Sequence, residues 1–241
     1  MSKIPITVRI GVTGHRVLSC EDLLNESVGK VLARLDRLLE HSPHTYVAVS
    51  PLAEGADRLV AKRVLGWQSN NCEPSELDSP LPMPADEYAK DFLTSESKAE
   101  FRELLARAVH SQALETDAEK FNRNDNDSAE VQNQKKEARR QSYRNVGFWV
   151  VDNCDILIAI WNGDKAKGVG GTAEIVEYAL GVGRPVVWIH SETGEINSER
   201  FGSRLLNALK HHDAYNAENL TESQIASEVD RRFARLKKAS G

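Results

Sequence analysis

Cysteine is scarce in the 241-residue sequence, and it follows no recognisable spacing. Cys20, Cys72 and Cys154 form neither a CxxC pair nor a Cys/His pattern with the spacing of metal ligands. An odd count without such spacing argues against a disulfide framework and predicts free thiols in a reducing cytoplasm. We expect Cys154 to be a small core residue. The histidines form no ligand pattern either, so the sequence predicts neither a metal nor a cofactor.

Long apolar segments and an excess of positive charge are missing as well. No run approaches the ~18 apolar residues of a membrane-spanning helix, and the N-terminal residues MSKIPITVRI lack the apolar stretch of a signal peptide. The formal net charge is −5, so nucleic acid is not expected to be the main partner. These absences predict a cytoplasmic protein that neither enters a membrane nor binds nucleic acid.

Familiar catalytic and nucleotide-binding motifs do not occur: there is no GxxxxGK[ST] loop, no GxGxxG, and no spacing that supports a Ser/His/Asp or Cys/His set. The chain instead alternates short apolar runs with helical patterns. The runs predict strands at 6–12, 45–50, 77–81, 155–161 and 185–189, and helices at 21–40, 56–64, 95–114, 130–151, 172–182 and 221–237. This order predicts one Rossmann-like α/β domain over residues 1–241, with helices on both faces of a parallel sheet, a helical insertion at about 83–150 and a C-terminal helix.

Loops that bear glycine follow three of the expected strands, at the edge of the sheet where open α/β folds bind ligands. The first loop is Thr13-Gly14-His15-Arg16. Arg16 can pair with a phosphate through two nitrogens, and His15 can donate to a phosphate or to a ribose hydroxyl. The alternative is a tight turn that carries a surface arginine.

The second loop contains Leu52, Ala53, Glu54, Gly55 and Asp57, all candidate ligand residues. Gly55 is expected to make the turn. Glu54 is either structural or functional, because an acid at this edge can bind ribose hydroxyls or act as a general base. For Asp57 we favour a role as the cap of the helix that follows.

The third loop ends in Gly170-Gly171-Thr172 and leads into an expected helix. The free N–H groups and the dipole at a helix N-terminus attract anions, so we predict that this loop binds phosphate. Thr172 is expected to cap the helix and to donate to the phosphate. Glu174, in the first turn, either faces the ligand or complements the helix dipole.

Arg140 and Tyr143 share one face of the helix expected at 130–151, because they are three residues apart. A cation and an aromatic ring on one face suit a phosphate and a base, and the pair is expected to close over the ligand. The alternative is a solvated basic face with Tyr143 at the edge of the core.

Three motifs in this order resemble the SLOG superfamily: IGVTGHRVL at 10–18, SPLAEGADRLVA at 50–61, and CDILIAIWNG with GVGGTAEIV at 154–176. LPMPADEYAKDF at 81–92 and Tyr143 before Gly147 resemble one bacterial branch of it. The resemblance covers about residues 5–190. It implies a Rossmann-like fold that binds nucleotides or nucleotide-derived signals, as in the cytokinin-activating LOG enzymes, the DNA-uptake protein DprA and ligand-sensing domains of bacterial defence systems.

The LOG enzymes carry PGGxGTxxE, whereas here Glu174 stands one position closer to Thr172 than that pattern requires. One residue turns a helical side chain by about 100°, so hydrolase activity does not carry over on this motif. The resemblance therefore implies a sensor of a nucleotide-derived signal, such as a cyclic ADP-ribose-like molecule, in bacterial stress or phage defence, acting as a homo-oligomer or through an effector protein. The alternative is an enzyme that hydrolyses the N-glycosidic bond of nucleoside 5′-monophosphates, with Glu54 or Glu174 as catalytic candidates.

Overall fold

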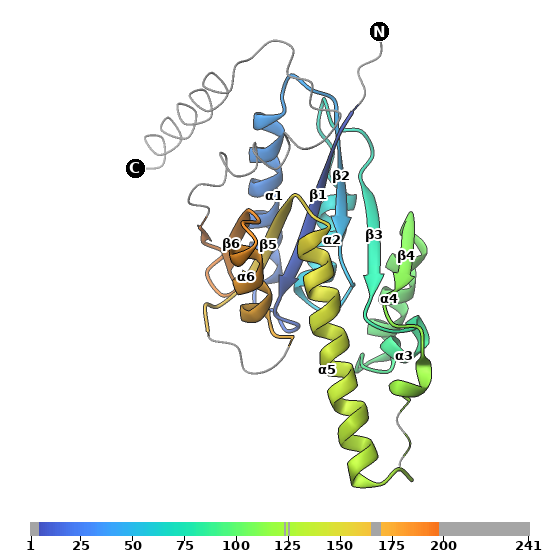
Figure 1. Ribbon diagram of the computed structural model, residues 1–241. Coiled ribbons are helices and arrows are strands. Elements are labelled where there is room, and N and C mark those ends of the chain that lie inside the picture. The colour runs from blue at the N-terminus through green and yellow to red at the C-terminus, as the bar shows by residue number, and fades with distance from the viewer. Residues whose placement is uncertain (1–4, 123, 125, 165–169, 198–241) are drawn as a thin grey trace.

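The computed structural model describes residues 5–122, 124, 126–164 and 170–197 (Figure 1). Its strands are β1 (Ile6–Gly14), β2 (His44–Val49), β3 (Glu76–Leu81), β4 (His110–Ala113), β5 (Ile156–Trp161), β6 (Val186–His190) and β7 (Ile196–Asn197). Its helices are α1 (Glu21–Leu38), α2 (Ala56–Leu65), α3 (Ala85–Ala89), α4 (Ser95–Ala106), α5 (Ala129–Asp152) and α6 (Thr172–Gly181), with a 3-10 turn η1 (Ala118–Lys120). The helix predicted at 221–237 lies outside the described residues.

The seven strands form one sheet of order β4-β3-β2-β1-β5-β6-β7. Neighbouring strands are parallel, except that β6 and β7 form an antiparallel pair. Helices alternate with these strands along the chain, so the predicted α/β class with a parallel sheet is confirmed. The strand order reverses at β1, which lies between β2 and β5. In open α/β sheets the crevice beside such a reversal is where ligands bind.

Side chains of β1 pack into the core on one face of the sheet, where Val8 and Ile10 are buried together with apolar residues of α1, α2 and α4. On the opposite face, Val150 of α5 and Ile175 of α6 belong to a second buried cluster with residues of β2 and β5. Because successive strand residues point to opposite faces, one strand can serve both layers. Helices therefore cover both faces of the sheet, as predicted (Figure 1).

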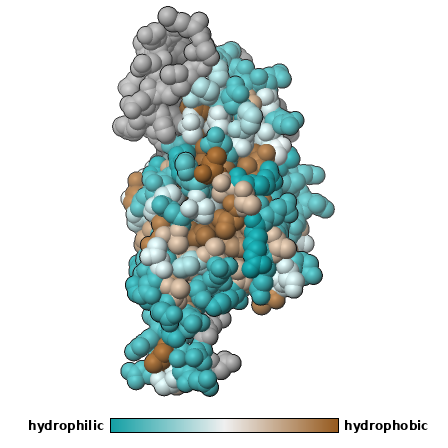
Figure 2. Space-filling model, turned by 90° about the vertical axis from the view of Figure 1, so that its right-hand side faces the viewer, coloured by the Kyte–Doolittle hydropathy of each residue, from teal (hydrophilic) through white to brown (hydrophobic). Residues whose placement is uncertain are grey.

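The helix predicted at 95–114 is wrong in its second half. Helix α4 ends at Ala106, and β4 follows as an edge strand parallel to β3. Backbone hydrogen bonds flank this strand pair at both ends: Val109 N donates to Leu77 O at 2.9 Å, and Leu114 N donates to Leu81 O at 2.9 Å. The sequence HSQA of β4 is polar and largely exposed, so no alternation of apolar residues announces it. Figure 2 shows this side of the molecule, where hydrophobic residues gather near the middle of a mostly hydrophilic surface.

Helix α5 extends well beyond the sheet at its N-terminal end (Figure 1). It begins at a cap in which Ser128 Oγ accepts from Val131 N at 3.4 Å. Midway along, the buried Arg139 pairs with Asp91 at 2.6 Å and with Glu87 at 3.2 Å, which fixes α5 to the α3 region. The C-terminal half of the helix packs on the sheet and supplies one wall of the candidate site.

Within the described ranges, no helix is long and apolar enough to cross a membrane, and no cluster of His, Cys, Asp and Glu side chains could hold a metal ion. The three cysteines are free thiols. Cys154 is buried, as predicted, and burial raises the pKa of its thiol to about 12. A thiol that stays protonated is a packing element and not a nucleophile.

Candidate functional site

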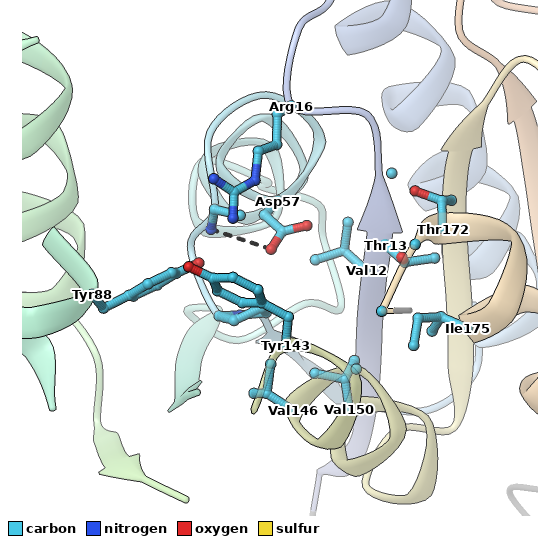
Figure 3. A pocket seen from close by; sticks show the side chains of 16 residues that line it. Val12, Thr13, Arg16, Asp57, Tyr88, Tyr143, Val146, Val150, Thr172 and Ile175 are labelled. Atoms are coloured by element: carbon cyan, nitrogen blue, oxygen red, sulfur yellow. Dashed lines mark hydrogen bonds between the residues drawn. The ribbon is translucent and has the colours of Figure 1, made fainter. Parts of the chain in front are cut away.

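A cavity of about 310 Å³ opens at the carboxyl end of β1 (Figure 3). Its walls come from six places in the chain: the end of β1 with the loop that follows it, the loop after β2, the first turn of α2, α3, the C-terminal half of α5, and the first turn of α6 with the glycines before it. The lining residues are Val12, Thr13, Gly14, Arg16, Pro51, Ala53, Asp57, Tyr88, Tyr143, Val146, Gly147, Val150, Gly170, Gly171, Thr172 and Ile175.

The cavity brings together residues from all three predicted loops and from α5. The predicted ligand residues that line it are Thr13, Gly14, Arg16, Ala53, Asp57, Tyr143, Gly170, Gly171 and Thr172. The predicted residues that do not line it are His15, Leu52, Glu54, Gly55, Arg140 and Glu174. Nine of the fifteen predicted residues thus line the cavity, and the other six lie outside it.

His15 holds the first loop in place. Its backbone N–H donates to Ile160 O at 3.0 Å, and its ring Nε2 lies 3.3 Å from the N–H of Asn162. Its carbonyl accepts from Ala56 N at 3.0 Å, which joins the first loop to the start of α2. Gly55 allows this approach, because it has a φ of 75° and a Cβ there would collide with the carbonyl oxygen of His15. His15 and Gly55 thus join the first loop to the start of α2.

The second loop contains a residue whose backbone is in the left-handed region, which residues other than glycine rarely adopt. Leu52 is buried and has a φ of 60°, in the left-handed region that costs a non-glycine residue free energy. Two bonds hold it there: its N–H donates to Ser50 Oγ at 3.1 Å, and its carbonyl accepts from Arg58 Nε at 3.0 Å. Strain of this kind concentrates at functional sites. Here the strained Leu52 lies between Pro51 and Ala53, which both line the cavity.

Glu54 points away from the cavity. Its carboxylate accepts a hydrogen bond from the Ser97 hydroxyl of α4, and it lines a separate hollow of about 720 Å³ on the side of α1 and α2. Glu54 was expected to be either structural or functional, and its hydrogen bond with Ser97 agrees with the structural role. Arg16 lines both hollows.

Asp57 is the acid that lines the cavity. The N-cap of α2 is Gly55, so Asp57 is not the cap; its Oδ2 instead accepts from the loop N–H of Ala53 at 3.2 Å. Its side chain is buried, and the desolvation raises its pKa from 3.8 to about 7, against the opposing effects of the Ala53 hydrogen bond and of Arg16 and Arg58. A carboxyl in a cleft with such a shift is a candidate for recognition or proton transfer.

The raised pKa predicts a pH dependence of stability. The folded protein holds the Asp57 proton more tightly than the unfolded chain does. The protonated Asp57 therefore contributes fully to the free energy of unfolding below pH 3.8, and this contribution is lost as the pH rises to about 7. Asp57→Asn should therefore gain stability relative to the wild type through this window, by an upper bound of about 4 kcal/mol above it. Urea unfolding of both proteins across the pH range measures the difference. A difference that does not change with pH would show that Asp57 titrates normally.

The third loop is held by its own carboxylate. Glu174 Oε2 accepts from Gly170 N at 2.6 Å, and Glu174 Oε1 lies 2.7 Å from Arg144 Nε. The N-cap of α6 is Gly171 and forms no side-chain cap, so the prediction that Thr172 caps this helix is wrong. Thr172 is the first helical residue instead, and its side chain lines the cavity. Glu174 thus orders the turn that presents Gly171 and Thr172.

Tyr143 belongs to the α5 wall of the cavity. Arg16, from the loop after β1, lies over its ring, with the guanidinium carbon 5.3 Å from the ring centre (Figure 3). The Tyr143 hydroxyl donates to Asp91, and burial together with this bond raises the Tyr143 pKa to about 12. Arg140 is exposed and pairs with Glu137 at 3.5 Å. The cation beside Tyr143 is therefore Arg16 of the first loop and not Arg140 of its own helix.

Several lining residues escaped the sequence analysis. Val146, Gly147 and Val150 continue the stripe that Tyr143 begins, at the spacing of one helix face, and that spacing could have identified them. Tyr88 lies in the segment at 81–92 that resembles one bacterial branch of the SLOG superfamily, but helical spacing does not mark it as a lining residue. It is buried, with its ring centre 6.1 Å from that of Tyr143, and it reads in the sequence as an ordinary core residue.

No family model and no curated protein matches this chain. Among solved structures, the chain aligns with a crystal structure described as the ABC domain in complex with L-Trp from Streptococcus pneumonia. The alignment covers 88% of each chain, with 9% sequence identity and a TM-score of 0.19. So low a score carries no argument about this protein. The site is therefore interpreted from its own geometry.

Proposed function

We propose that the cavity binds a nucleotide or a nucleotide-derived signal. One observation carries the proposal: the first turn of α6 and the side chain of Arg16 line the same cavity at the carboxyl edge of the sheet. A helix N-terminus and a guanidinium group are both preferred partners of phosphate. In this arrangement the phosphate lies against Gly171 and Thr172, and Arg16 approaches it from the opposite loop.

The rest of the cavity suits the nucleoside part of such a ligand. Val146 and Val150 of α5 and Ile175 of α6 form an apolar wall, and the ring of Tyr143 stands beside them. Ligand sites are mostly apolar with a few placed polar groups, in volumes from about 300 to 1,000 Å³. At about 310 Å³ the cavity accommodates a single nucleoside unit, and a larger ligand would extend past Arg16 toward the second hollow.

The resemblance to the SLOG superfamily supports the same proposal. The motifs that carry it contribute Gly14 and Arg16, Ala53 and Asp57, and Gly171 and Thr172 to one cavity. On this basis we propose a sensor that passes the occupancy of the cavity to an effector protein or to a second copy of the chain. A role in bacterial stress or phage defence rests on the resemblance.

Hydrolysis of an N-glycosidic bond is the second candidate function, and Asp57 is the observation that favours it. Neither Glu54 nor Glu174 lines the cavity, whereas Asp57 does and can hold a proton near neutral pH. A protonated acid beside the ligand can assist the departure of a base. If the protein is an enzyme, Asp57 is the residue we expect to carry the proton.

A panel of nucleotides distinguishes the two functions. We expect a nucleoside 5′-monophosphate or an ADP-ribose-like compound to raise the melting temperature, by about 5–11 °C for a ligand at a hundredfold excess over its Kd. Chromatography of the same mixtures shows whether the ligand is recovered intact, as sensing requires, or is split to a free base. If no member of the panel stabilises the protein, the nucleotide proposal is wrong.

A further inference from the structure

Asp57 occupies an unusual position for a carboxyl group. It is the acidic residue among those that line the cavity, and its side chain is only 6% exposed. Oδ2 accepts from Ala53 N at 3.2 Å, and no other hydrogen bond reaches this carboxyl from the described residues. The second oxygen, Oδ1, is therefore the one left to meet a ligand.

The charged and titratable groups around Asp57 form their contacts with other residues, although Arg16 and Arg58 lie near enough to oppose the rise of its pKa. Arg58, its neighbour on α2, donates to Leu52 O at 3.0 Å and pairs with Glu100 at 2.9 Å. Arg16, from the loop after β1, lies over the Tyr143 ring, and the buried Tyr88 of α3 completes the surroundings (Figure 3). Among the residues that the structure describes, none forms an ion pair with Asp57. Burial therefore outweighs the attraction of Arg16 and Arg58, and it favours the neutral form of the Asp57 carboxyl.

We propose that Asp57 recognises the ligand as a neutral carboxylic acid, donating its proton in a hydrogen bond to a phosphate oxygen. This inference rests on the proposed function and specifies how its phosphate is held. A carboxylate in this place would repel the phosphate, whereas the acid forms an O–H···O⁻ bond, which is short and strong. The pKa of about 7 in the ligand-free protein agrees with this role, and a bound anion raises it further.

The chemistry has a measurable consequence. Above pH 7 the ligand-free Asp57 is ionised, so binding must take up one proton from solvent for each ligand. The affinity should then fall by about tenfold for each pH unit above the free pKa, until the pKa of the complex is reached. The phosphate ionises near pH 6, below this window, and so does not mimic the effect.

Calorimetric titration with adenosine 5′-monophosphate at about pH 8, in buffers of different ionisation enthalpy, counts the protons taken up. Wild type should take up close to one proton, and Asp57→Asn none, with an affinity that no longer falls above pH 7. The asparagine keeps the size and can still accept from Ala53 N. Asp86→Asn removes the same charge from an exposed position of α3 and should behave as wild type.

The outcomes separate the two proposals. Binding of adenosine 5′-monophosphate without proton uptake would overturn the role of Asp57 and leave the nucleotide site intact. Failure of every nucleotide in the panel to bind would overturn both. A test without ligand is the ¹³C NMR titration of the Asp57 carboxyl, where a pKa near its ordinary value of about 4 would also overturn the inference.

Discussion

Replacement of Arg139 by methionine is expected to lower the free energy of unfolding by about 3–5 kcal/mol. Arg139 is 2% exposed, and it pairs with Asp91 and Glu87 while also donating to Phe121 O at 3.0 Å. Methionine fills much of the same space, but it removes the cation that the Asp91 and Glu87 carboxylates share, although Glu87 keeps its pair with Lys90 and Asp91 keeps its bond from Tyr143. Removal of one partner of a buried ion pair is costly because the remaining charge stays desolvated.

Arg140→Met is the matched control, because Arg140 is the next residue of α5 and is exposed. Its ion pair with Glu137 spans 3.5 Å at the surface, and its loss should cost less than about 0.5 kcal/mol. Thermal unfolding of both variants should show a fall of about 10 °C for Arg139→Met and almost none for Arg140→Met. Equal effects would mean that the buried network does not stabilise the fold.

A triple variant tests the cause. When Glu87→Gln and Asp91→Asn accompany Arg139→Met, both carboxylate charges that faced Arg139 disappear, and part of the lost stability should return. The Tyr143 hydroxyl then has an amide as its acceptor in place of a carboxylate, so the wall of the cavity keeps a hydrogen bond. If the triple variant is no more stable than Arg139→Met, lost packing and not stranded charge explains the effect.

The second large effect is expected for Gly171→Asp, which should weaken nucleotide binding by about a hundredfold or more without unfolding the protein. Gly171 has a φ of −77° and a ψ of 159°, values that any residue adopts, and it is the N-cap of α6. Aspartate is among the preferred N-cap residues, so the helix itself should be stabilised. The same carboxylate stands where the phosphate is proposed to bind, and the two anions repel each other.

Gly171→Asn separates charge from size. Asparagine has nearly the shape of aspartate and caps helices as well, but it carries no charge. We expect Gly171→Asn to bind adenosine 5′-monophosphate more tightly than Gly171→Asp, and both variants to melt at or above the wild-type temperature. Unchanged affinity in Gly171→Asp would place the phosphate elsewhere in the cavity, or outside it.

The strands that the sequence revealed are those that the fold buries. The runs that became β1, β2, β5 and β6 are apolar because helices cover them, so their pattern is visible without a structure. Strand β4 has no such pattern, since His110–Ala113 is exposed at the edge and is defined by backbone bonds to β3. Backbone pairing leaves no mark on side-chain periodicity, which explains the mistaken helix.

The sequence predicts where the loops that line the candidate cavity lie, but it does not predict which of their side chains face it. Sequence order locates loops at the carboxyl edge, yet it does not say which side chain of a loop turns inward. Glu54 and Asp57 are separated by three positions, and the start of α2 at Ala56 sends Asp57 to the cavity and Glu54 to Ser97. The same holds for Arg139 and Arg140, where one residue is a turn of about 100° and decides between core and solvent.

Helix α5 also has a mechanical property. It is one unbroken helix of 24 residues, about 36 Å long, whose C-terminal half lines the candidate cavity and whose N-terminal end stands clear of the sheet. Gly147 lets it approach Ile175 of α6 so closely that no side chain could lie between the two helices. The candidate cavity, the Arg139 cluster and the projecting N-terminal end are therefore all carried by one continuous helix.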